Sequence, residues 1–188
     1  MKTFHQLQEG VYDPNIFKAI FMAGGPGSGK SYVAKRTTSG LGLKMVNSDD
    51  IYEKMLNDAG LDTTPEDIYS DQGQEIRGRA KGVTSRMKGN FLDGRLGLII
   101  DGTGKDYSKI AKQVQGLKLL GYECYMIFVN TSLDTAQEQN AKRKRTLPEK
   151  EVATMWNEVQ SNIGGFQRLF GNSNFIIVDN NMAGEDVF

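Results

Sequence analysis

The feature that most constrains this chain is the segment 24–31, GGPGSGKS. It follows an apolar run at residues 16–23, and a helical pattern begins at Gly29. The segment fits G-x-x-x-x-G-K-[S/T] in full, with glycines that tolerate positive φ and leave backbone N–H groups accessible. A loop of this kind at a helix N-terminus surrounds phosphate groups. A dinucleotide-binding loop is disfavoured because it has no role for the Lys-Ser pair, so the sequence predicts a nucleotide phosphate-binding loop.

The expected ligands of this loop are ATP and Mg²⁺. In such loops the lysine reaches the β- and γ-phosphates and the serine hydroxyl binds Mg²⁺, which assigns these roles to Lys30 and Ser31. The residues expected to contact the nucleotide are Gly25, Pro26, Gly27, Ser28, Gly29, Lys30, Ser31 and Tyr32.

Short apolar runs alternate with helical patterns along the chain. The runs, rich in β-branched or aromatic residues, lie at 16–23, 43–47, 96–101, 122–130 and 175–179. Helical patterns lie at 29–40, 50–58, 65–93 (one or two helices), 108–120, 132–143 and 148–170. This alternation predicts an α/β fold with a parallel sheet covered on both faces, and 188 residues fit one domain.

Carboxylates follow two of the predicted strands. Asp49 and Asp50 come after the second run, and Asp101 ends the third. Ligands of open α/β sheets sit at the carboxyl ends of strands. If the first and third strands are neighbours, Asp101 lies near Ser31 and holds Mg²⁺ through water, while Asp49 faces the γ-phosphate as a general base. The alternative is that Asp49 or Asp50 caps the following helix. Thr103 is a candidate for the acceptor pocket or a turn residue.

A basic segment, AKRKRTLP, occupies residues 141–148. Phosphoryl transfer needs cations over the transferring phosphate, and guanidinium groups suit phosphate oxygens better than ammonium groups. Arg143 and Arg145 are therefore stronger candidates than Lys142 and Lys144 for a catalytic lid. The alternative is a solvated helix end whose charge complements the helix dipole.

A second basic region, residues 77–95, follows an acidic stretch at 47–75. Its cations are expected either to hold a nucleic-acid backbone or phosphorylated molecule or to form an exposed helix face. The net charge does not indicate a class of binding partner, because 23 basic residues balance 23 acidic ones. The single cysteine, Cys124, is expected to be buried in a cytoplasmic protein, and His5 alone makes histidine catalysis a poor candidate. No signal peptide and no membrane span are expected.

Four motifs in this order, GGPGSGKS, NSDD, IIDGTG and NAKRKRTLP, resemble those of P-loop kinases related to phage polynucleotide kinase and zeta toxins. The resemblance runs from about Ile16 to Asp179. It implies a five-stranded parallel sheet of order 2-3-1-4-5 in a single domain, with a helical acceptor-side insertion at about 56–93 and a lid at about 139–149.

The resemblance also assigns roles. It implies that Asp49 is the general base for the acceptor hydroxyl, that Asp101 is the acid at the third strand end, and that Arg143 and Arg145 grip the ATP phosphates. Two positions depart from the family pattern. Tyr52 stands where polynucleotide kinases hold the acceptor's phosphate with an arginine, and Gln139 stands near the position where the family has an upstream lid arginine.

Three functions remain open from the sequence. The first is an ATP-dependent kinase acting on a hydroxyl of a nucleic acid or nucleotide, such as a polynucleotide 5′-hydroxyl or a modified base. A nucleoside or nucleotide-sugar acceptor is the small-molecule variant of the same activity. The second is an NTP-hydrolysing switch without an acceptor, and the third is a binding protein without turnover. The lid-like KRKR and the short chain favour the first function over the second, and the intact Lys30, Ser31, Asp49 and Asp101 argue against the third. The sequence does not predict an oligomeric state.

Overall fold

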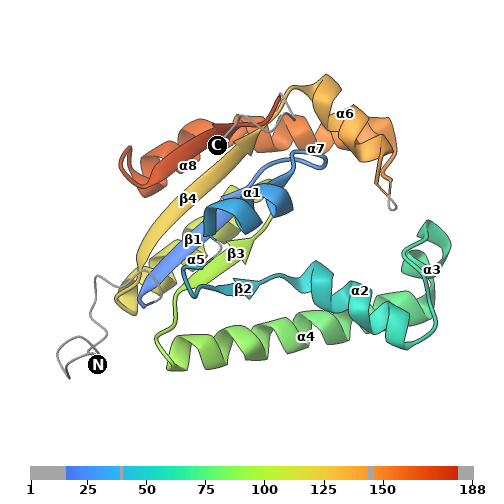
Figure 1. Ribbon diagram of the computed structural model, residues 1–188, viewed down its shortest axis with the longest axis horizontal. Helices are drawn as coiled ribbons and strands as arrows, with labels where there is room; N and C mark the ends of the chain where they lie inside the picture. Colours follow the sequence, from blue (N-terminus) through green and yellow to red (C-terminus); the bar gives the residue numbers. More distant parts are fainter. Residues whose placement is uncertain (1–15, 39, 144–145, 182–188) are drawn as a thin grey trace.

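The strands form one parallel sheet in the computed structural model, which describes residues 16–38, 40–143 and 146–181 (Figure 1). The strands are β1 (Lys18–Ala23), β2 (Lys44–Val46), β3 (Leu98–Asp101), β4 (Glu123–Asn130) and β5 (Phe175–Asp179). Their order is β2-β3-β1-β4-β5. Each predicted apolar run contains one of these strands, and the predicted order and fold class are confirmed.

The central strand β1 lies between β3 and β4, and this position brings distant segments together. Met22 is in register with Asp101 on β3, and Ala23 is in register with Phe128 on β4. The loop after β1 therefore begins beside the carboxylate at the end of β3. The conditional prediction that the first and third strands are neighbours is confirmed.

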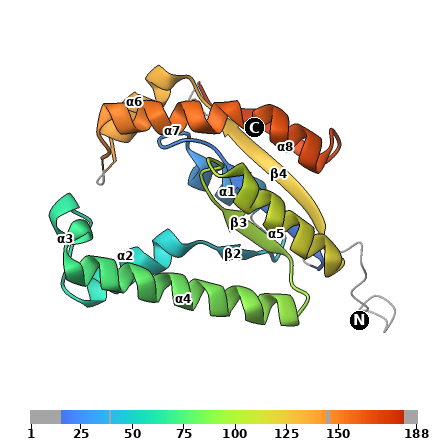
Figure 2. The ribbon, with the colours of Figure 1, turned by 180° about the vertical axis from the view of Figure 1, so that it is seen from behind.

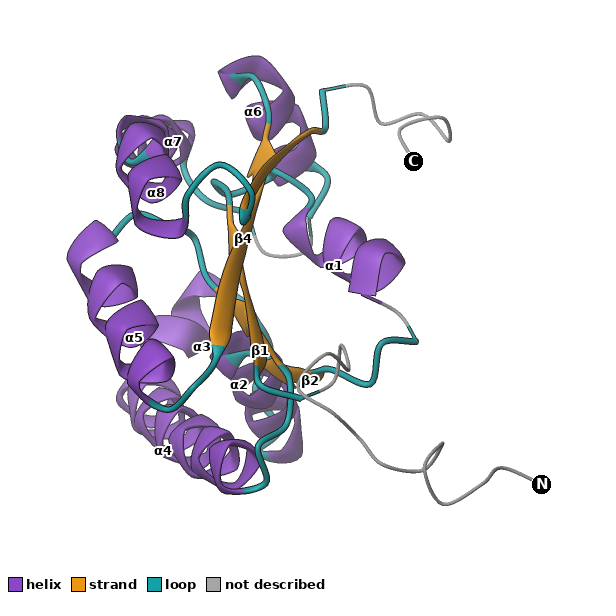
Figure 3. Cartoon of the chain, turned by 90° about the vertical axis from the view of Figure 1, so that its left-hand side faces the viewer, coloured by secondary structure: helices purple, strands orange, loops and turns teal. Residues whose placement is uncertain are grey.

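The helices cover the two faces of the sheet unequally. Figure 3 shows α1 on one side of the sheet and α4, α5, α7 and α8 on the other. This second side faces the viewer in Figure 2. The helices are α1 (Lys30–Thr38), α2 (Ser48–Asp58), α3 (Pro65–Tyr69), α4 (Asp71–Asp93), α5 (Tyr107–Leu119), α6 (Leu133–Ala141), α7 (Glu149–Ser161) and α8 (Ile163–Phe170).

Two of the predicted helical stretches are interrupted. The stretch 65–93 divides at Ser70, whose hydroxyl oxygen accepts a hydrogen bond from Gly73 N and caps α4. The stretch 148–170 divides at Asn162, whose amide nitrogen donates to Gly104 O at 3.0 Å and Lys105 O at 2.9 Å. The second break thus ties the junction of α7 and α8 to the loop that follows β3.

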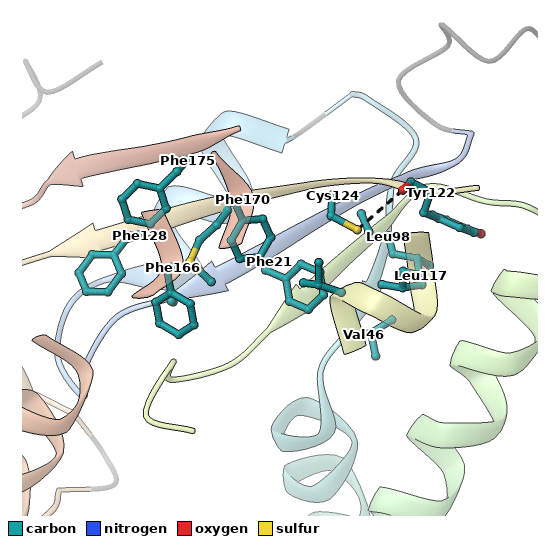
Figure 4. Packing of buried hydrophobic residues seen from close by; sticks show 14 of the residues in the cluster. Phe21, Val46, Leu98, Leu117, Tyr122, Cys124, Phe128, Phe166, Phe170 and Phe175 are labelled. Carbon is teal, nitrogen blue, oxygen red and sulfur yellow. Dashed lines mark hydrogen bonds between the residues drawn. The ribbon is translucent and has the colours of Figure 1, made fainter. Parts of the chain in front are cut away.

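The largest apolar cluster lies between the sheet and helices α5, α7 and α8 (Figure 4). Phe21, Phe128 and Phe166 are fully buried in it, and the Phe21 and Phe170 rings meet edge to face at 5.5 Å. Cys124 is buried there as predicted. This packing gives the carboxyl edge of the sheet a rigid base.

Helices α2, α3 and α4 share a separate apolar cluster. Its buried members are Tyr52, Leu56, Ile68, Ile76 and Ala80. The helices that follow β2 therefore have a core of their own beside the sheet. Within the part of the chain that the structure describes, no helix is long and apolar enough to cross a lipid bilayer.

Candidate functional site

The loop between β1 and α1 has the backbone conformation that its glycines permit. Gly24, Gly27 and Gly29 have φ values of 151°, 75° and 81°. A Cβ atom at Gly27 would collide with the backbone carbonyl oxygen of Ala136 on α6. Glycine is therefore required at position 27 for both its dihedral angle and its contact with α6.

Lys30 folds back over this loop. Its ammonium group donates to Gly24 O at 2.6 Å and Gly25 O at 3.1 Å. Burial lowers the pKa of Lys30 to about 8, an effect that the Asp101 carboxylate opposes and the Arg143 charge reinforces. The ammonium group thus lies within electrostatic reach of three of the residues singled out in the sequence, since Asp49 also contributes.

Asp101 has one paired and one unpaired carboxylate oxygen. Oδ2 accepts a hydrogen bond from Asn47 Nδ2 at 3.2 Å, whereas Oδ1 is buried without a partner among the described residues. Burial raises the pKa of Asp101, the Lys30 charge lowers it, Asp49 and then Asp50 raise it further, and the backbone N–H of Gly102 lowers it by a weak hydrogen bond to the carboxylate. A buried carboxylate oxygen without a protein partner fits a water or a water-bound cation, because such groups are otherwise satisfied.

Asp49 and Asp50 lie in the first turn of α2, and both are exposed. The expectation that one of them caps this helix is wrong. Asn47 is the N-cap, and its side-chain oxygen accepts from Asp49 N at 2.8 Å. Both carboxylates are therefore left exposed at the N-terminus of α2 and are not used to cap it.

The basic segment is described only in part. Arg143 follows α6, is exposed, and donates its backbone N–H to Asn140 O at 3.2 Å. Lys144 and Arg145 lie outside the described residues, so the expectation for Arg145 stays a prediction. The influence of Arg143 on the pKa of Lys30 puts its charge on the same side of the molecule as the loop.

The other two predicted residues of helix α1 lie at the molecular surface. Ser31 is exposed in the first turn. The Tyr32 ring is half exposed, and its hydroxyl accepts from Arg36 at 2.6 Å. The backbone N–H of Tyr32 donates to Gly29 O at 3.0 Å. The structure therefore places the Tyr32 side chain on the outside of α1.

Several residues that the sequence analysis did not single out hold the loop in place. Trp156 of α7 lies against Gly25 and donates its indole N–H to Thr131 O at 2.8 Å. Asn180, directly after β5, donates from its side chain to Ser28 O at 2.9 Å. Their signals, a lone tryptophan and an asparagine following a strand, are too common in sequences to indicate such roles.

The loop after β3 also supports the phosphate-binding loop. Thr103 accepts a hydrogen bond from Gly24 N at 3.0 Å through its carbonyl oxygen. This contact places the backbone of Thr103 beside the loop, and a role for its side chain in the acceptor pocket stays a prediction.

Tyr52 belongs to the core of the α2–α4 cluster rather than to an exposed surface. It is 3% exposed, and its hydroxyl is buried without a hydrogen-bond partner in the described structure. The guanidinium carbon of Arg77, on α4, lies 6.0 Å from its ring centroid. The Tyr52 side chain is therefore part of the packing between α2 and α4.

The sequence profile of one protein family, described as an AAA domain (AAA_33), matches residues 20–161. The chain belongs to the AAA_33 family. The matched range begins within β1 and ends with α7, so this AAA_33 domain includes the loop, Asp49, Asp101 and the basic segment. A comparison with curated protein sequences finds no match.

Several solved structures share the fold of this AAA_33 domain. A chain in the AvrRxo1-ORF1:-ORF2 complex with ATP is similar at a TM-score of 0.69 and 16% identity, over 89% of this chain and 56% of that one. A chain of the PezAT toxin–antitoxin system of Streptococcus pneumoniae gives a TM-score of 0.66 at 15% identity, over 88% and 70%.

A third similar structure is a chain of the Pnkp1/Rnl/Hen1 RNA repair complex, with a TM-score of 0.61 and 19% identity, over 81% of this chain and 47% of that one. At such identities the likeness is one of fold. The chain spans little more than half of the matched AvrRxo1 chain.

Proposed function

We propose that this protein is an ATP-dependent kinase that transfers the γ-phosphate of ATP to a hydroxyl group. The observation that carries the proposal is the position of the Lys30 ammonium, which lies on the loop under the combined influence of Asp101, Arg143 and Asp49. A cation on a phosphate-binding loop, flanked by carboxylates and a guanidinium group, matches the requirements of phosphoryl transfer.

The nucleotide is held by the backbone N–H groups of the loop and the N-terminus of α1. Lys30 exchanges its two bonds to loop carbonyls for bonds to the β- and γ-phosphates. Ser31 and, through water, Asp101 would hold Mg²⁺, which fits the unpartnered Oδ1 of Asp101. When bound, Mg²⁺ supplies charge neutralisation at the β- and γ-phosphate oxygens.

The acceptor side is proposed to begin at Asp49. Its exposed carboxylate accepts the proton of the acceptor hydroxyl as that oxygen bonds to the γ-phosphorus, and the bond to the β-phosphate oxygen breaks to release ADP. Arg143, together with Arg145, stabilises the charge that spreads over the transferring phosphoryl group. On this proposal residues 139–149 form the lid, and residues 56–93 form the acceptor-side insertion of a single domain.

A hydroxyl of a nucleic acid or nucleotide is the proposed acceptor. The motif resemblance to polynucleotide kinases and the fold similarity to a chain of an RNA repair complex support it. A nucleoside or nucleotide sugar is the alternative acceptor, and the assay below includes both.

A transfer assay with γ-labelled ATP and Mg²⁺ tests the proposal. The acceptors are a 5′-hydroxyl oligonucleotide, base-hydroxymethylated DNA, nucleosides, nucleoside monophosphates and UDP-amino sugars. Asp49→Asn is the test variant, and Asp93→Asn, at the exposed far end of α4, is the matched control.

Label on one acceptor, lost in Asp49→Asn and kept in Asp93→Asn, supports the kinase and names its substrate class. Label released only as free phosphate, at a rate that Asp49→Asn leaves unchanged, contradicts the proposal and indicates an NTP-hydrolysing protein.

A further inference from the structure

Asn140 is a buried asparagine at the end of α6. It is 4% exposed, although asparagine is usually a surface residue. Its Nδ2 donates to Leu147 O at 2.8 Å, and Leu147 N donates to its Oδ1 at 3.1 Å. The side-chain amide thus pairs with both backbone polar groups of one residue, as a neighbouring strand would.

This pair of bonds joins Asn140, which directly precedes the basic segment, to Leu147 near the end of that segment. Arg143 lies between Asn140 and Leu147 in the chain, and its own backbone N–H donates to Asn140 O at 3.2 Å. Asn140 therefore contacts the segment on both sides of the arginine. Restricting the backbone in this way before a ligand arrives reduces the conformational entropy that is lost when the arginine becomes ordered.

The same face of α6 also touches the phosphate-binding loop. Ala136 and Asn140 are four residues apart, so they lie on one side of the helix, and both are buried. Ala136 is the residue whose backbone meets Gly27. One helix face thus contacts the loop at Ala136 and holds the basic segment one turn later.

We propose that Asn140 is a positioning residue, which fixes the segment carrying Arg143 relative to the phosphate-binding loop and thereby places the Arg143 guanidinium over the γ-phosphate of ATP. The inference rests on the proposed function, because it assigns the guanidinium to the transferring phosphate. The electrostatic influence of Arg143 on Lys30 supports this placement, since it requires the two charges to lie near each other.

The alternative is that Asn140 only stabilises the fold. Either role predicts that Asn140→Ala leaves Leu147 N and O unsatisfied and lowers the melting temperature. Only the positioning role predicts that the effect on catalysis passes through Arg143. A double-mutant cycle separates the two roles, because residues acting through one another are not additive.

The experiment compares wild type, Asn140→Ala, Arg143→Ala and the double variant, with Asn90→Ala on the exposed surface of α4 as the matched control. Asn140→Ser, whose hydroxyl can satisfy one group of Leu147, serves if Asn140→Ala does not fold. Hydrolysis of γ-labelled ATP by water, with Mg²⁺ and no added acceptor, gives kcat and KM. Binding of ATP and ADP, each with Mg²⁺, is measured by calorimetry.

We expect Asn140→Ala to lower kcat about 10- to 100-fold with little change in KM, and to lower it less than about twofold further in the Arg143→Ala background. Wild type should bind ATP more tightly than ADP, and Asn140→Ala should lose most of that preference. The control should match wild type in every measurement.

The inference is overturned if Asn140→Ala and Asn140→Ser leave kcat and the ATP preference unchanged. It is equally overturned if their effects multiply with that of Arg143→Ala. A wild-type protein that prefers ATP to ADP but releases no phosphate without an acceptor is consistent with a strictly acceptor-dependent kinase. The binding of ATP and ADP by the four proteins of the cycle then decides the role of Asn140, while the transfer assay with acceptors tests the proposed kinase separately. Equal wild-type affinity for ATP and ADP contradicts the placement of Arg143 over the γ-phosphate.

Discussion

Replacing Gly27 by alanine should disrupt the phosphate-binding loop. The added Cβ would overlap the carbonyl oxygen of Ala136 and lie 3.2 Å from its Cα. These are backbone atoms of α6, so they cannot rotate away as a side chain would. The φ of 75° at this position adds strain for any residue with a Cβ.

The cost is about 2–5 kcal/mol, from about 1–2 kcal/mol for the left-handed dihedral angle and about 1–3 kcal/mol for overpacking. If the loop moves away from α6 to relieve the overlap, ATP affinity should fall at least about tenfold, since each 1.4 kcal/mol is a factor of ten. If the loop stays, the melting temperature should fall by about 4 °C or more.

The assay uses Trp156, the only tryptophan in the chain, which lies against Gly25 of the same loop. Its fluorescence during ATP titration reports affinity, and its fluorescence on heating reports unfolding. Gly78→Ala is the matched control, because a Cβ there meets nothing within 4 Å and the site is inside a helix. This control should keep wild-type affinity and gain about 0.5–1 kcal/mol of stability.

A Gly27→Ala protein with wild-type affinity and a wild-type melting temperature would refute the reasoning. Such a result would mean that α6 shifts freely relative to the loop, contrary to the close packing that makes glycine necessary here.

Three further predictions follow from burial. Because burial lowers the pKa of Lys30 to about 8, the ammonium loses its charge above that pH. The affinity for ATP, measured by titration, should therefore fall between pH 7 and 9. The Lys30→Met variant should show no such fall. The unfolded chain holds this proton up to about pH 10.5, so stability from this group should rise between pH 8 and 10.5 in denaturant titrations. Burial also raises the pKa of Cys124 to about 11. Iodoacetamide at pH 8 should therefore label the unfolded protein rapidly and the native protein hardly at all. Equal labelling rates in the two states would contradict the burial of Cys124. Phe166→Ala should lower the free energy of unfolding by about 3–5 kcal/mol, because Phe166 is fully buried. Leu119→Ala, at a site that is 89% exposed, should lower it by less than about 0.5 kcal/mol. Similar losses in the two variants would argue against the described core.

Local patterns were sufficient to predict the sheet. Each strand is a compact apolar run between turn residues, and the strand order followed from the resemblance carried by the four motifs. The helix breaks at Ser70 and Asn162 were harder to predict, because apolar periodicity continues across both. Ser70 ends one helix by capping the next, and Asn162 by bonding to a loop far away in sequence.

The parts of the candidate site that belong to a sequence motif could be predicted, whereas the residues that contact the loop only through the folded structure could not. The loop, Lys30 and the neighbourhood of Asp101 could be inferred from spacing and strand order. The capping role of Asn47 was missed because Asp49 and Asp50, two and three residues later, are equally good caps in sequence terms. Asn140 and Asn180 were not identified because their partners are backbone atoms, which leave no signal in the sequence.

The side-chain bond from Asn180 to Ser28 O has a consequence for biosynthesis. Ser28 is synthesised 152 residues before Asn180, which follows β5 and donates its backbone N–H to Asn130 O. A nascent chain that has not yet reached β5 therefore lacks this support of the loop, so we expect a nucleotide to bind it more weakly, and to stabilise it less, than a chain that includes β5. Nucleotide binding would then report that the segment around β5 has been made and has packed beside the loop.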